Sequence, residues 1–168
     1  RDVPVFTGAF QESSEHLSWG VKAIEADIYS QSIIPASGNS VTVAIIDSGC
    51  EDIDFLKDKL VPGYDFFEND SDAFHDESTD SHGTFLSGIV ADCVGDLPVK
   101  IMPVRVLDAK EASLINVING IRYAADNGAD VINISLYAAL ENCKSLEDAI
   151  TYAEEKNITV VVSAGNSR

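Results

Sequence analysis

The chain has 168 residues, of which 28 are acidic and 11 basic, and its formal net charge is −17. That length predicts one domain with a real core, because about 70% of the unfolded surface can be buried at this size. The charge excludes nucleic acid and anionic membrane surfaces as partners, since binding to either depends on Lys and Arg side chains.

Apolar runs of strand length alternate along the chain with amphipathic stretches of helix length. The strands are expected at 41–46, 100–107, 130–136 and 158–163. Helices are expected at about 85–93, 113–127 and 145–156, with capping or stop signals at Gly95, at Ser113 and Gly128, and at Ser145, Asp148 and Asn157. This alternation is typical of an α/β fold in which helices cover a mostly parallel sheet. The longest uncharged stretch, 28–46, contains Pro35 and Gly38 and predicts no membrane span.

Neither the acidic residues nor the cysteines form a metal-binding pattern. The acidic run at 68–80 is interpreted as a solvated loop, because an EF-hand loop that began at Asp70 would have Phe74 and His75 at its fifth and sixth positions. The three cysteines are too few and too scattered for a disulfide scaffold or a zinc site, and they are expected to be free or buried thiols: Cys50, Cys93 and Cys143. No metal site is predicted.

Three short polar segments, 47–49, 81–84 and 163–166, lie where an open α/β sheet places function, at or near the carboxyl ends of strands. Asp47 ends a buried strand and must have a hydrogen-bonding partner, since an unpaired buried carboxylate is costly. His82, in the first turn of a helix, can present its ring to that carboxylate and act as a general base. Asn166 can donate to an oxyanion. Taken singly, each residue also fits a turn or a helix cap.

The order of the three residues along the chain is more specific than any one of them. An aspartate comes first, then a histidine at a helix start, then an asparagine after a later strand. This order resembles the subtilisin-like serine protease (subtilase) family. The resemblance runs from about Trp19 to Asn166, and its motifs lie at 18–24, 43–49, 82–88, 102–108, 131–136 and 163–166. It implies a three-layer fold in which helices cover both faces of a mostly parallel sheet.

The resemblance also implies roles for individual residues. Asp47 would be the orienting acid, His82 the general base and Asn166 the oxyanion donor. The edge that pairs with an extended substrate would be Ser135, Leu136 and Tyr137. Ala164 and Gly165, with Asn166, would line one wall of the pocket for the residue before the cut. The implied partners are a peptide or protein substrate and a propeptide, and the implied location is secreted or at the cell surface of a bacterium.

The sequence departs from the family pattern at several positions. Phe85 stands where a second histidine is usual, and Tyr137 where a glycine is common. The segment 91–98 is too short for the calcium loop that many members insert there, so no cofactor is expected, although calcium elsewhere stays open. The largest departure is the nucleophile, because the family's Gly-Thr-Ser motif does not occur in the chain.

The missing serine predicts that 1–168 is the amino-terminal portion of one subtilisin-like catalytic domain. The fold would be incomplete in this chain, because a parallel sheet that stops after its fourth strand leaves an exposed edge. The serine-bearing carboxyl-terminal portion is therefore an expected partner. Two explanations of the end at Arg168 stay open: cleavage there, by self-processing or by another protease, or an artificial boundary.

The expected function is that of a serine endopeptidase, active only when the serine-bearing segment completes it. Short loops and an acidic surface are compatible with bacterial processing proteases, including those that trim leader peptides from lanthipeptides. The alternative is a catalytically silent relative that serves as a binding or regulatory module. A nucleotide-binding Rossmann fold is disfavoured, because the turn at 47–50 places a carboxylate where a phosphate would sit.

Overall fold

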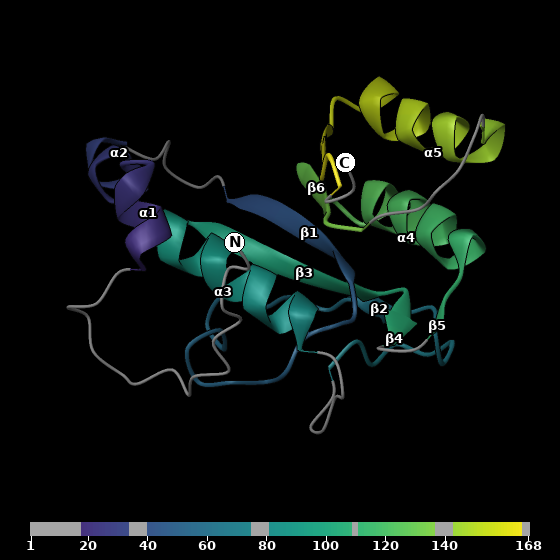
Figure 1. Ribbon diagram of the computed structural model, residues 1–168, viewed down its shortest axis with the longest axis horizontal. Helices are drawn as coiled ribbons and strands as arrows, with labels where there is room; N and C mark the ends of the chain where they lie inside the picture. Colours follow the sequence, from purple (N-terminus) through teal and green to yellow (C-terminus); the bar gives the residue numbers. More distant parts are fainter. Residues whose placement is uncertain (1–17, 34–39, 75–80, 109–110, 137–142, 166–168) are drawn as a thin grey trace.

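The sheet of this computed structural model has five parallel strands (Figure 1). The structure describes residues 18–33, 40–74, 81–108, 111–136 and 143–165. The strand order is β2-β3-β1-β6-β7, with β2 at Tyr64–Asp65, β3 at Val99–Arg105, β1 at Val41–Asp47, β6 at Val131–Ile134 and β7 at Thr159–Val162. All four neighbouring pairs are parallel, and the predicted parallel sheet is confirmed.

Helices cover both faces of the sheet, as predicted. The helices are α1 (Trp19–Ala23), α2 (Ala26–Ser32), α3 (His82–Val94), α4 (Leu114–Asp126) and α5 (Lys144–Glu155). In Figure 1, α3 lies on one side of the sheet with α1 and α2 at its end, while α4 and α5 lie on the other. Within the described residues, no helix is long and apolar enough to cross a membrane.

The alternation of side chains along β1 explains the two covered faces. Ala44 and Ile46 point to the side of α4 and α5, where they join a buried cluster with Ile121 and Ala149. Ile45 points the other way and packs in a second cluster that includes Ala91 of α3. Because successive strand residues face opposite sides, a continuous apolar run such as 43–46 is buried on both. Full burial of a side chain such as Ile46 contributes roughly 1.5–3 kcal/mol.

The predicted strand at 100–107 is wrong in its last part. β3 ends at Arg105, and Leu107 belongs instead to a short antiparallel pair, β4 (Leu107–Asp108) with β5 (Glu111–Ala112). Leu107 pairs with Ala112 across this turn. Two-residue strands carry no measurable periodicity, so the sequence pattern merged the two segments into one.

The predicted capping box of the last helix is also wrong. Helix α5 begins at Lys144, after Cys143, so Ser145 lies inside its first turn and caps nothing. Asp148, expected to reach back to the helix start, forms an ion pair with Lys144 one turn earlier. Ser113 does stand at the N-cap position of α4, but its side chain makes no capping hydrogen bond. Gly95 ends α3 with a φ of 51°, although its ψ of −125° lies outside the expected left-handed helical region.

Candidate active site

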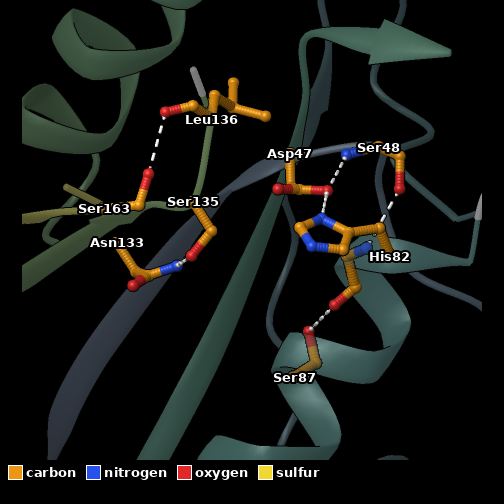
Figure 2. Close-up of polar contacts among 9 residues, drawn as sticks. Asp47, Ser48, His82, Ser87, Asn133, Ser135, Leu136 and Ser163 are labelled. Carbon is orange, nitrogen blue, oxygen red and sulfur yellow. Dashed lines mark hydrogen bonds and ion pairs between the residues drawn. The ribbon is translucent and has the colours of Figure 1, made fainter. Parts of the chain in front are cut away.

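Asp47 and His82 are hydrogen-bonded neighbours, as predicted. Asp47 is the last residue of the central strand β1, and its side chain is fully buried. His82 is the first residue of α3, and its Nδ1 lies 2.8 Å from Asp47 Oδ1 (Figure 2). The His82 side chain is 46% exposed. One strand end and one helix start thus bring together two residues 35 positions apart.

The contact fixes the protonation pattern of the imidazole ring. An ionised carboxylate can only accept hydrogen bonds, so Nδ1 carries a proton and donates a hydrogen bond to Asp47. Nε2 is then the ring atom that bears a lone pair and can act as a base. The Ser48 backbone N–H also donates to Asp47 Oδ1, at 2.8 Å, which offsets part of the cost of burying that carboxylate.

Two hydrogen bonds and one close backbone approach hold the start of α3 against the loop that follows β1. The Gly83 N–H donates to Ser48 Oγ at 3.0 Å, and the Glu51 N–H donates to Thr84 Oγ1 at 3.0 Å. A Cβ atom at Gly83 would lie 2.1 Å from the Gly49 carbonyl oxygen, so only glycine allows this approach. These supports were not predicted from the sequence, because they arise from the docking of a helix against a distant loop.

A buried ion pair lies beside the site and was also missed. Arg105 ends β3 opposite Asp47, and its Nη1 donates to Asp65 Oδ2 at 2.7 Å and lies 3.4 Å from Glu68. Burial alone would lower the pKa of Arg105, but the two carboxylates outweigh it and raise that pKa. The guanidinium is therefore charged at any working pH. An arginine at the end of a buried strand requires such a partner, and this signal was available in the sequence.

Ser135 and Leu136 follow β6, the neighbour of β1, at the same end of the sheet as Asp47. Ile46 is in register with Ile134, so Ser135 comes one residue past the paired segment, as Asp47 does on β1. Ala164 and Gly165 follow β7, the next strand, and Gly165 has a φ of 80°. The expected substrate edge and pocket wall therefore leave two adjacent strand ends.

Tyr137 and Asn166 lie outside the described residues. In the segments that precede them, the Ser163 hydroxyl donates to the Leu136 carbonyl at 3.0 Å (Figure 2). Asn133 Nδ2 donates to Ser135 Oγ, also at 3.0 Å. Figure 2 draws these contacts to one side of the Asp47–His82 pair.

All three cysteines are free thiols, as expected. Cys50 is the nearest in sequence to the site, and its burial raises the pKa of its thiol to about 11. A buried thiol that keeps its proton at neutral pH is a poor nucleophile, so Cys50 does not substitute for a serine. Among the residues that the structure describes, no three His, Cys, Asp or Glu side chains are grouped to hold a metal ion.

Comparison with known proteins shows the family of this chain. The model of the Subtilase family matches residues 38–168, more than half of the chain. The chain belongs to the subtilase family. Its relatives within the family include thermitase from Thermoactinomyces vulgaris, which is 38% identical over an alignment of 142 residues. That alignment covers 79% of this chain and 50% of thermitase. The major intracellular serine protease of Bacillus subtilis is 28% identical over 99% of the chain and 54% of its own length.

Solved structures of proteases share the fold of this chain. A lanthipeptide protease superposes with a TM-score of 0.67 and 32% identity, over 75% of this chain and 39% of that one. The epidermin leader peptide processing serine protease from Staphylococcus aureus superposes with a TM-score of 0.70 and 26% identity, over 92% of this chain and 44% of that one. The subtilase chain described here spans about half of the length of the two curated relatives above.

Proposed function

We propose that residues 1–168 are the amino-terminal portion of a subtilisin-like catalytic domain and supply the acid–base half of a serine endopeptidase. The observation that carries the proposal is the 2.8 Å contact between Asp47 and His82 at the carboxyl end of the central strand of a subtilase. Support comes also from a relative that is named a serine protease, of whose length the match to this chain covers about half.

In the proposed reaction, His82 accepts and donates the protons, and Asp47 stabilises the positive charge that forms on the His82 ring. His82 Nε2 takes the proton of a serine hydroxyl while the serine oxygen bonds to the substrate carbonyl carbon. Asp47 stabilises the resulting imidazolium through Nδ1. The imidazolium then gives its proton to the leaving amine as the carbon–nitrogen bond breaks, and water hydrolyses the acyl-enzyme by the same route. Asn166 donates to the oxyanion that forms at the carbonyl.

The nucleophile is proposed to come from a segment outside these residues. Ser48 already has a structural role, because its hydroxyl accepts the Gly83 N–H and its backbone N–H donates to Asp47. The hydroxyl of Ser163 is likewise engaged, with the Leu136 carbonyl. The partner is therefore the carboxyl-terminal portion of the same protease, and a propeptide is a further proposed partner. No cofactor is required for the steps above.

The substrate is proposed to be an extended peptide that pairs with Ser135, Leu136 and Tyr137. Ala164 and Gly165 form a wall for the residue before the cut. The net charge of −17 favours basic peptides through steering, an effect that salt weakens. Two solved neighbours are named for lanthipeptides or leader peptide processing, which supports a leader-processing substrate as the narrower proposal. A bacterial source is proposed from the relatives, and a secreted or cell-surface location from the family resemblance alone, since one of the relatives is named as intracellular.

The proposal is tested by peptide hydrolysis with residues 1–168 alone and with the serine-bearing segment supplied in trans or by fusion. We expect no hydrolysis by 1–168, and hydrolysis by the completed protease that a serine-directed phosphonate abolishes, since the mechanism needs an activated serine. Casein, a general protease substrate, provides the comparison. Cleavage of a leader-containing precursor at one site, without cleavage of casein at many sites, would support the proposal of a leader-processing substrate. Hydrolysis by 1–168 alone would contradict the proposal that the nucleophile lies outside these residues. A complete protein that binds peptide without cutting it would support the alternative of a silent binding module.

A further inference from the structure

The ends of β6 and β7 are joined beyond the point where their regular pairing stops. The last pair in register is Ile134 with Val162, and the Ser163 N–H donates to the Ile134 carbonyl at 3.1 Å. The Ser163 hydroxyl then donates to the Leu136 carbonyl at 3.0 Å. The Ser163 side chain thus links the two segments two residues beyond the end of β6, where the backbone pairing has stopped (Figure 2).

The residues on both sides of this contact are those assigned to the substrate. Leu136 belongs to the edge that would pair with the peptide, and Ser163 directly precedes Ala164 and Gly165 of the pocket wall. The two segments leave the sheet from neighbouring strands, so their separation sets the width between edge and wall. Within the described residues 135–136 and 163–165, the Ser163 hydroxyl is the only side-chain group that hydrogen-bonds from one segment to the other.

A second contact steadies the same edge from within β6. Asn133 Nδ2 donates to Ser135 Oγ at 3.0 Å, which holds the first residue after the strand. This bond stays inside one segment and does not reach β7. The spacing between the segments therefore depends on Ser163, and the two side chains act on different parts of the site.

We propose that Ser163 is a positioning residue that sets the width of the pocket for the residue before the cut, and so its selectivity. The inference rests on the proposed function, because the edge and wall have a substrate only if the completed chain is a peptidase. Serine is suited to the task, since its hydroxyl lies close to its own backbone and needs few rotamers to reach a neighbouring carbonyl. Threonine keeps that hydroxyl, and alanine removes it.

The test uses the complete, serine-containing protease and its S163A and S163T variants. Turnover and KM are measured for peptides that differ only in the residue before the cut, from alanine to leucine to phenylalanine. We expect S163A to narrow the ratio of kcat/KM between the best and the worst peptide by roughly three- to tenfold, the range available to one neutral hydrogen bond. The change should lie mainly in KM, the pH profile should not move, and S163T should restore the ratio.

Ser32 offers a matched control, because its exposed hydroxyl also donates to a backbone carbonyl, that of Tyr29, at 2.7 Å. S32A should leave every ratio unchanged. Titration with a serine-directed phosphonate counts competent sites, so partial misfolding of S163A cannot imitate a selectivity change. A ratio that S163A leaves intact, or that S163T fails to restore, overturns the inference. If the protease cuts only a leader-containing precursor, the same three residues are placed before the cut in that precursor. If the unsubstituted complete protease cuts neither the peptide series nor the precursor, the proposed function itself is wrong, and the inference is overturned with it.

Discussion

Asp47→Asn in the complete protease should lower kcat by about 10⁴-fold at neutral pH, the loss that the wrong imidazole tautomer causes in serine proteases. The asparagine amide can donate to Nδ1, which favours the tautomer with its proton on Nε2. That tautomer cannot accept the serine proton. Peptide affinity should change little, because Asp47 is fully buried and touches the ring rather than the substrate. Steady-state turnover and the affinity for an uncleaved peptide measure the two effects separately.

Asp130→Asn is the matched control for that substitution. Asp130 lies at the opposite end of β1, where its Oδ2 accepts the Thr42 N–H at 2.8 Å. The asparagine oxygen can accept the same bond, so turnover should stay within about twofold of the unsubstituted enzyme. A comparable loss in both variants would show that Asp47 acts through stability and not through the histidine.

Gly83→Ala should lower both the melting temperature and the turnover. The new Cβ would lie 2.1 Å from the Gly49 carbonyl oxygen, so α3 or the loop after β1 must move. Alanine favours a helix interior over glycine by about 1 kcal/mol, but a backbone clash of this depth costs more. The shift also strains the bond from Gly83 to Ser48 and moves His82 from Asp47. Since a misplacement of about 1 Å can cost 10²-fold, we expect a loss of that size in kcat.

Gly20→Ala separates this clash from the general effect of a glycine-to-alanine change in a helix. Gly20 lies in α1, and a Cβ there would meet no atom within 4 Å. Its melting temperature should be equal or higher, and its turnover unchanged. Thermal unfolding and single-turnover cleavage of both variants provide the measurements. A Gly83→Ala enzyme as stable and as active as Gly20→Ala would contradict the docking geometry described for α3.

The Asp47–His82 pair could be predicted because each residue lies in a recognisable local motif and the order of the two motifs resembles that of the subtilase family. A carboxylate at the end of a buried strand must find a partner, and the Ser-His-Gly-Thr segment has the composition of a helix start that can provide one. The parallel sheet was predictable for a related reason. Runs such as 43–46, apolar on both faces, fit only a strand that helices cover on either side.

The supports of the pair were beyond sequence reasoning, because they depend on how the elements dock. Ser48 and Gly83 are 35 residues apart, and nothing in either motif specifies that the hydroxyl of one accepts the N–H of the other. The early start of α5 is a separate, local difference, in which Asp148 pairs with Lys144 one turn earlier and not with the expected cap. The missed Arg105–Asp65 ion pair is different, because a buried charge at the end of a strand requires a carboxylate partner and could have been recognised from the sequence.

The most direct test of the central claim is to locate the reactive serine. The complete protease is treated with a serine-directed phosphonate, digested, and mapped by mass spectrometry, alongside a His82→Ala variant. We predict one label per molecule, on a serine outside residues 1–168, and its loss in His82→Ala, because His82 is the base that activates that serine. A label on Ser48, Ser81, Ser163 or any other serine within 1–168, or labelling that persists undiminished without His82, would contradict the assignment of Asp47 and His82 as the acid–base half of a serine protease.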